Sequence, residues 1–124
     1  MNFNEISWAD MRIENINIEY DQLSLIIVDD FEKCQCCIKC RGFVGITDLC
    51  MWDDTIIFEA DIIKPCIYDN EYLKKVYETY DKDFDYGGGR ILGENLLELR
   101  IMLSNHLTFS VYCQKIDVTE YNEN

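Results

Sequence analysis

Hydrophobic and polar residues alternate one by one in the N-terminal part of the chain. Between residues 12 and 20, isoleucine and tyrosine side chains are separated by polar ones. Residues 23–28 form an apolar run, and residues 33–41 alternate again. A repeat of two residues places successive side chains on opposite faces of a β-strand. This part of the sequence therefore predicts three strands, joined by turns at residues 21–22 and 29–30.

The strand pattern resumes after a bend bracketed by Gly42 and Gly45. Residues 116–121 are expected to continue the preceding strand or to form a short edge strand. The further predicted strands are residues 46–52, 55–63, 97–103, 107–113 and 116–121. The fold class that follows is mainly β (α+β), an antiparallel meander or sandwich-like sheet of about seven or eight strands.

The pattern changes once, after Pro65. Over residues 69–82 apolar side chains recur at spacings of three and four, which is typical of one face of a helix. These side chains are Tyr72, Leu73, Val76, Tyr77 and Tyr80. Asp69 or Asn70 would cap the N-terminus, because both side chains accept hydrogen bonds from backbone N–H groups. We predict one amphipathic helix here, followed by a flexible connection at residues 83–89 that ends in three glycines.

Net charge is the most unusual property of the composition. Of 124 residues, 24 are Asp or Glu and 11 are Lys or Arg, which gives a formal net charge of −13. Such an acidic chain repels phosphate backbones, which argues against DNA or RNA as a partner. No apolar run has the length that crosses a bilayer. The first residues resemble no secretory signal, so we expect a cytoplasmic protein. The length fits a single domain over residues 1–124.

Four of the seven cysteines lie close together, at Cys34, Cys36, Cys37 and Cys40. On a strand, Cys34, Cys36 and Cys40 share a face, and reduced cysteine packs as a small hydrophobic residue. Side chains at i and i+2 lie roughly 6.5–7 Å apart along a strand, farther than thiolates that share one zinc ion. A core strand is the favoured interpretation. The alternative is a metal-binding or redox-linked protein that uses this cluster.

No segment combines the groups that catalysis needs. The only histidine, His106, follows a predicted turn, where polar residues are common. Paired aspartates also fall in predicted turns. Residues 81–87 place oxygen ligands at alternate positions before a glycine, but Leu92 stands where a calcium loop has its glutamate. We therefore predict a protein that is not an enzyme, with no catalytic residue, metal or cofactor.

Several short motifs resemble those of a family of small, acidic, β-rich bacterial proteins. Residues 40–45 and 52–57 match its pattern of an aromatic residue between glycines followed by Trp-Asp-Asp-x-Ile-Ile. Residues 8–13 match its opening Trp-x-Asp-x-x-Ile element, and Cys113 lies in the second strand of the last predicted hairpin, as in that family. Its members look like the immunity proteins of polymorphic or contact-dependent toxin systems. The resemblance implies a single domain that binds and neutralises a toxin.

The charge suggests which kind of toxin. A nuclease toxin is basic because it must hold phosphates, and an acidic inhibitor complements it. Residues 48–61 contain five acids and no base, whereas residues 33–41 are basic. The candidate partner-binding residues lie in acidic turns and are Asp29, Asp30, Phe31, Glu32, Asp53 and Asp54. We expect an immunity protein for a basic cognate toxin domain; an acidic accessory protein is a further alternative.

Overall fold

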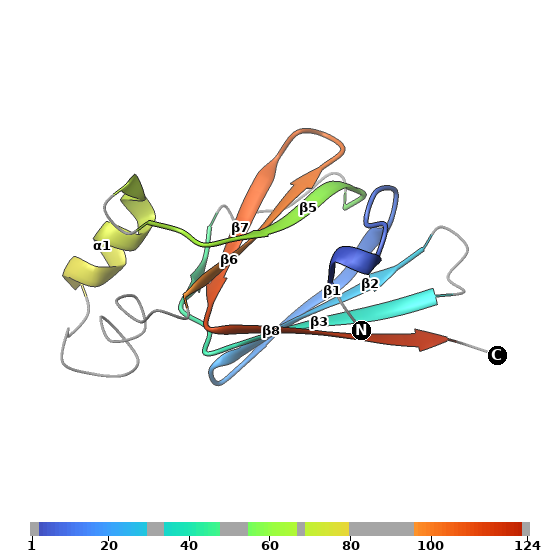
Figure 1. Ribbon diagram of the computed structural model, residues 1–124, viewed down its shortest axis with the longest axis horizontal. Helices are drawn as coiled ribbons and strands as arrows, with labels where there is room; N and C mark the ends of the chain where they lie inside the picture. The colour runs from blue at the N-terminus through green and yellow to red at the C-terminus, as the bar shows by residue number, and fades with distance from the viewer. Residues whose placement is uncertain (1–2, 30–33, 48–54, 67–68, 80–95, 123–124) are drawn as a thin grey trace.

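The computed structural model describes residues 3–29, 34–47, 55–66, 69–79 and 96–122, and most of these described residues lie in strands (Figure 1). Within these ranges the chain forms eight strands, a 3₁₀ turn and one short α-helix. In chain order they are η1 (Phe3–Glu5), β1 (Arg12–Glu19), β2 (Gln22–Val28), β3 (Cys34–Arg41), β4 (Gly45–Ile46), β5 (Ile57–Ile63), α1 (Glu71–Thr79), β6 (Leu97–Leu103), β7 (Thr108–Cys113) and β8 (Lys115–Asn122). The predicted mainly β class is confirmed.

The strands form two antiparallel sheets of four. One has the order β1-β2-β3-β8 and the other β4-β7-β6-β5. β8 continues from β7 after the single residue Gln114, as one prediction had it, and it lies at the edge of the other sheet, but it is not short. β8 spans eight residues and pairs along its length with β3.

One corner between the sheets is made by two strands that bend together. Three residues separate β3 from β4, and a single residue, Gln114, separates β7 from β8. Pairing continues through the bend, because Gln114 N–H donates to the Arg41 carbonyl over 2.9 Å and Val44 N–H to the Tyr112 carbonyl over 2.8 Å. Gly42 has a φ of 64°, and a side chain there would collide with Gln114. Bent strands of this kind carry a sheet around a corner.

A second corner joins β1 to β5. Ile57 donates its N–H to the Met11 carbonyl over 2.7 Å and accepts the Asp10 N–H over 2.8 Å. Ile13 N–H donates to the Thr55 carbonyl over 2.9 Å. The two sheets are thus joined at the first corner by strands that continue from one sheet into the other and at the second by hydrogen bonds, and they enclose a common core.

The core draws its side chains from the inward faces of both sheets. Its fully buried members include Leu23, Leu25, Ile27, Ile38, Leu99, Ile101, Leu103, Phe109 and Val111. At one end Trp8 packs on Phe3, with ring centroids 5.1 Å apart, and its indole N–H donates to the Phe3 carbonyl over 3.1 Å. The inward faces predicted from alternation are therefore confirmed for β3, β6 and β7, whereas on β1 Ile18 is 48% exposed.

Several predicted boundaries need correction. The β1–β2 turn is made by Tyr20 and Asp21, since Glu19 pairs directly with Gln22 and Tyr20 adopts a φ of 55°. Of the strand predicted over residues 46–52, two residues are described: Ile46 ends the short strand β4 (Gly45–Ile46), and Thr47 lies in a bend. Residues 48–52 lie outside the described residues.

The helix is confirmed, and it begins two residues later than predicted. α1 begins after Asn70, whose side-chain Oδ1 accepts the Leu73 N–H over 2.9 Å and so acts as the N-cap. It lies at the far end of the molecule from the tips of β3 and β8 (Figure 1). Residues 80–82, the predicted end of the helix, and residues 83–89, the predicted connection, lie outside the described residues. No helix in the described ranges has the length and apolar character to cross a membrane.

Candidate protein-binding surface

The acidic turns predicted to contact a partner lie mostly outside the described residues. Asp29 is described: it directly follows β2 and is partly buried. The others, which the structure does not describe, are Asp30, Phe31, Glu32, Asp53 and Asp54.

The strand register shows where the described residues that flank these turns lie relative to one another. Val28, the last residue of β2, pairs with Arg12 of β1. Arg12 also forms a bridge with Ile56, which directly precedes β5. The end of β2 and the beginning of β5 are therefore separated by one strand at the same end of the sandwich. The two acidic segments join the described structure at neighbouring positions.

A β-bulge at the beginning of β5 exposes an aromatic ring. The register of β5 against β6 shifts between Ile57 and Glu59, and Phe58 is the extra residue. Bulges redirect side chains, and the side chain of Phe58 is 55% exposed. Its ring lies edge-on to the imidazole of His106, with centroids 6.5 Å apart.

His106 belongs to the turn between β6 and β7. Its φ is 71°, and its N–H donates to the Leu103 carbonyl over 2.9 Å. The Asn105 side chain accepts the Leu107 N–H over 2.9 Å, which supports the turn locally. The predicted turn is thus confirmed, and His106 lies within it rather than at the start of the next strand.

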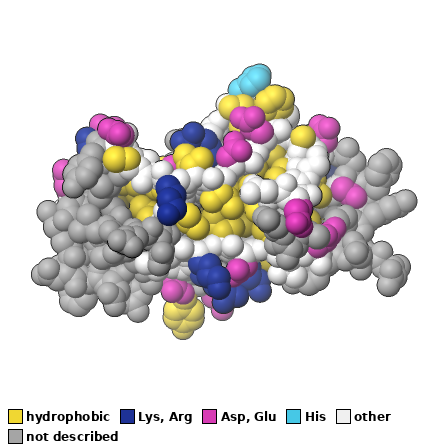
Figure 2. All heavy atoms as spheres, viewed as in Figure 1, with side chains coloured by type: hydrophobic (Ala, Val, Ile, Leu, Met, Phe, Trp, Pro, Cys, Tyr) yellow, Lys and Arg dark blue, Asp and Glu magenta, His cyan; other side chains and the backbone are white. Residues whose placement is uncertain are grey.

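Carboxylates continue along β5 from the exposed ring. Glu59 and Asp61 are both exposed, as is the apolar side chain of Ile56. We refer to Ile56, Phe58, Glu59, Asp61 and His106 as the β5 surface. Figure 2 shows hydrophobic and acidic side chains gathered next to the single histidine at the top of the view. An exposed aromatic residue beside charged side chains is a typical composition for a protein-binding site.

The opposite end of the molecule has different chemistry. Tyr20 is 97% exposed in the β1–β2 turn. Cross-strand pairing continues from Gln22 to Arg41 and Lys115, so two cations lie in one row near this turn. Asp117 is 3.4 Å from Arg41 and 4.0 Å from Lys115. Basic side chains are visible at the lower margin of Figure 2. The two acidic residues that flank Tyr20, Glu19 and Asp21, are also exposed, so acidic and basic side chains are mixed at this end.

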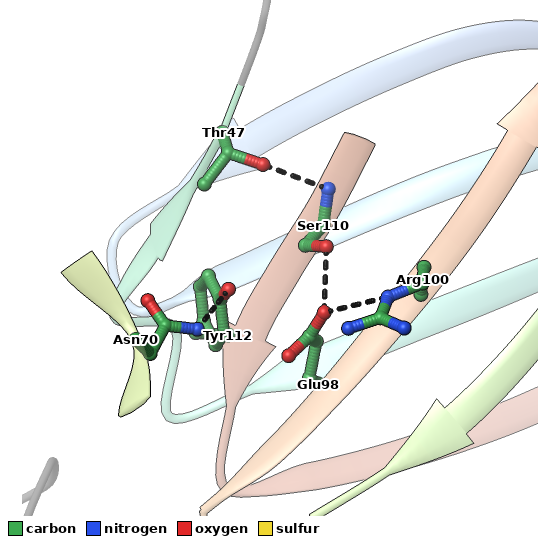
Figure 3. Close-up of polar contacts among 6 residues, drawn as sticks. All are labelled: Thr47, Asn70, Glu98, Arg100, Ser110 and Tyr112. Atoms are coloured by element: carbon green, nitrogen blue, oxygen red, sulfur yellow. Dashed lines mark hydrogen bonds and ion pairs between the residues drawn. The ribbon is translucent and has the colours of Figure 1, made fainter. Parts of the chain in front are cut away.

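A buried carboxylate forms the centre of a polar cluster on the outer face of the second sheet (Figure 3). Glu98 is only 2% exposed. Its Oε2 accepts the Ser110 hydroxyl over 2.8 Å and the Arg100 Nε–H over 3.0 Å. Ser110 N–H donates to the Thr47 hydroxyl over 3.0 Å. These bonds join β6, β7 and the segment after β4.

A second set of contacts attaches α1 to this sheet. The Asn70 side-chain amide donates to the Tyr112 hydroxyl over 2.8 Å, so the helix N-cap also bonds to β7. The rings of Tyr72 and Tyr112 are stacked 5.4 Å apart. Burial raises the pKa of Tyr112, and the Glu98 charge raises it further, whereas the bond from Asn70 lowers it. The phenol therefore stays protonated beyond its ordinary range. The Glu98 cluster thus joins the strands of this sheet to one another, and the contacts of Asn70 and Tyr72 attach the helix to it.

The strand alternation predicted for the cysteines is confirmed where it can be followed. Cys36 and Cys40 are buried in the core, and Cys37 is buried on the other face of β3. The Cys40 and Cys113 thiols are hydrogen-bonded, and this bond, together with burial, raises the pKa of Cys40 far above its usual value. A protonated, buried thiol is a poor metal ligand and nucleophile. No group of three metal-ligating side chains occurs among the described residues.

Comparisons with known proteins give no match. No family model, no curated protein and no solved structure matches this chain.

The β5 surface was not among the residues singled out from the sequence. Glu59 and Asp61 do lie in the run of five acids between residues 48 and 61, which is a usable signal. Phe58 could not be identified, because the strand pattern does not reveal the bulge that exposes it. His106 and Phe58 are 48 residues apart, and only the pairing of β5 with β6 brings them together.

Proposed function

We propose that this protein is a non-catalytic immunity protein that binds a basic toxin domain and occludes its active site. The observation that carries the proposal is the β5 surface, where the exposed ring of Phe58 is adjacent to the exposed carboxylates Glu59 and Asp61. A central aromatic anchor with charged neighbours supplies affinity and orientation at once.

Electrostatics would make such an inhibitor fast. An acidic surface attracts a basic partner over several ångströms and raises association rates by about 10- to 1000-fold. The net charge of −13 supplies the long-range field. The short-range match would come from Glu59 and Asp61 facing cationic side chains of the toxin.

A protein partner suits the geometry better than a small ligand does. Small-molecule sites are concave and mostly apolar. The β5 surface is instead a strand at the edge of a sheet, with a protruding ring and flanking charges. The buried, hydrogen-bonded state of Glu98 and Ser110 also makes them unsuitable as a substrate-contacting pair.

The direct experiment mixes the purified chain with the product of the neighbouring gene, which we expect to contain the basic toxin domain. We expect a complex at low salt, loss of toxin activity at one equivalent, and slower association when salt rises from about 0.05 M to about 0.5 M. The absence of any complex at low salt would overturn the proposal. A complex whose association rate is independent of salt would overturn its electrostatic basis.

A further inference from the structure

β5 lies at one edge of its sheet. β6 pairs with it on one side over the whole strand. On the other side, the described contacts are those that β1 and the residues before it make with residues 55–57. Beyond Ile57, no described strand runs along this side of β5.

The backbone of β5 has a definite orientation at this edge. Ile57 directs both its N–H and its carbonyl toward the residues that precede β1. Its cross-strand partner Leu103 turns its backbone groups away from β5, since its N–H donates to the Leu107 carbonyl and its carbonyl accepts the His106 N–H. Neighbouring residues of a strand turn their backbone groups to opposite sides, and the bulge at Phe58 accounts for one extra residue. Ala60 and Ile62 therefore direct their N–H and carbonyl groups away from β6, toward the open side.

Side chains along the same edge alternate in chemistry. Glu59 and Asp61 are exposed on the outer face of the sheet. Ala60 and Ile62 point to the other face, where they pack against the core. A strand added here would have its outward side chains next to carboxylates and its inward side chains next to apolar groups.

We propose that β5 accepts an extended segment of its partner as an added strand, and that basic and apolar residues alternate in this segment. The inference rests on the proposed function and specifies how the β5 surface engages a basic protein. Main-chain hydrogen bonds to Ala60 and Ile62 give affinity, and Glu59 and Asp61 select cationic side chains.

The same charges act against self-association. Two copies of β5 paired edge to edge would place carboxylates opposite or diagonal to carboxylates, which is destabilising. Charged residues and bulges are also the usual means by which edge strands avoid pairing with copies of themselves. The edge therefore favours a basic strand over a second copy of this chain.

The test uses synthetic peptides as long as β5, which has seven residues, with Lys and Val alternating. Binding to the intact chain is measured for the plain peptide and for two N-methylated forms, one methylated on every Lys and one on every Val. In a strand, all the N–H groups of one set face one neighbour. We expect one methylated form to lose at least about tenfold in affinity and the other to bind like the plain peptide. A Glu-Val peptide is the charge control and should not bind.

Equal binding of both methylated forms and the plain peptide would overturn strand addition, because recognition would then depend on side chains alone. Failure of the plain peptide to bind would overturn it as well. Neither result bears on the toxin complex, which is measured separately, so the two proposals fail independently.

A variant of the chain gives a second readout. Ala60→Pro removes an N–H on the open side without removing a bond to β6, and proline is tolerated at such edge positions. We expect the variant to lose peptide binding while its circular dichroism spectrum is retained. Retained binding by a folded Ala60→Pro chain would contradict the proposal.

Discussion

Carboxylates on the outer face of one sheet have opposite surroundings in two adjacent strands. On β6, Glu98 is 2% exposed and bonds to Ser110 and Arg100. On β5, Glu59 and Asp61 are exposed. The strands pair directly, with Asp61 opposite Arg100. Asp61 and Glu98 are therefore only two residue pairs apart along the sheet, yet the first carboxylate is available to a partner and the second joins strands.

The comparison shows that burial and partners, not residue type, determine what a carboxylate contributes. A buried charge is costly unless it is hydrogen-bonded, so removing Glu98 affects the folded state. An exposed charge contributes little to stability but acts on association with other molecules. The acidic composition therefore combines at least two roles.

The largest expected effect is on stability at Glu98. Glu98→Ala removes two hydrogen bonds and leaves Ser110, a buried hydroxyl, without its acceptor. We expect a loss of about 2–3 kcal/mol in the free energy of unfolding, measured by urea denaturation. Glu59→Ala on the adjacent strand is the matched control and should change it by less than about 0.5 kcal/mol. Equal losses of stability from the two variants would contradict the claim that the carboxylates of β5 and β6 have different roles.

The next effect is on binding at Phe58. Because its side chain is 55% exposed, Phe58→Ala should leave stability nearly unchanged. We expect toxin affinity to fall by about 2 kcal/mol, roughly 30-fold, in a titration with the toxin domain. Tyr20→Ala, which removes an even more exposed aromatic ring from the other end, is the control. A similar loss from both variants would contradict the location of the interface.

A smaller effect is expected where α1 meets the sheet. Asn70→Ala removes the N-cap bond to Leu73 and the bond to Tyr112. We expect a loss of about 1–2 kcal/mol in the free energy of unfolding, with toxin affinity unchanged. A double-mutant cycle with Tyr112→Phe measures the part due to the hydroxyl. Reduced toxin affinity would extend the interface toward the helix.

The smallest effect is a pH dependence at Tyr112. Its pKa is raised in the folded state above the ordinary value of 10.0, mainly by burial. Its contribution to stability is therefore present below pH 10 and is lost as pH rises from there through the folded pKa. Tyr112→Phe should reduce the alkaline loss of stability relative to the unmodified chain. Identical slopes above pH 10 would contradict the raised pKa.

Strand alternation predicted the local structure well because each strand buries one face. It predicted that Leu99 and Ile101 share a face, and both are fully buried. It could not predict that β8 pairs with β3, because that pairing joins residues about 75 to 90 positions apart and depends on the corner at Gly42. Hairpin order along the chain suggests only sequential neighbours.

The candidate site was less predictable than the fold. Glu98 occupies the outward-facing position that the alternation predicts, yet it is buried by tertiary contacts with β7. Phe58 occupies a position that only the bulge exposes. Local pattern assigns a side chain to a face, but the exposure of that face depends on what packs against it.

The central claim is that the β5 surface, and not net charge alone, binds the basic partner. The most direct test compares two double charge reversals that both change the net charge from −13 to −9, since each Glu or Asp to Lys change adds two. Glu59→Lys with Asp61→Lys alters the β5 surface. Glu19→Lys with Glu78→Lys alters exposed positions on β1 and α1.

Toxin association rates and affinities are measured for both variants at the same salt concentration. The account predicts that the β5 reversal weakens binding by at least about tenfold more than the control reversal. Equal weakening by the two variants would show that net charge alone attracts the partner, and would contradict the account.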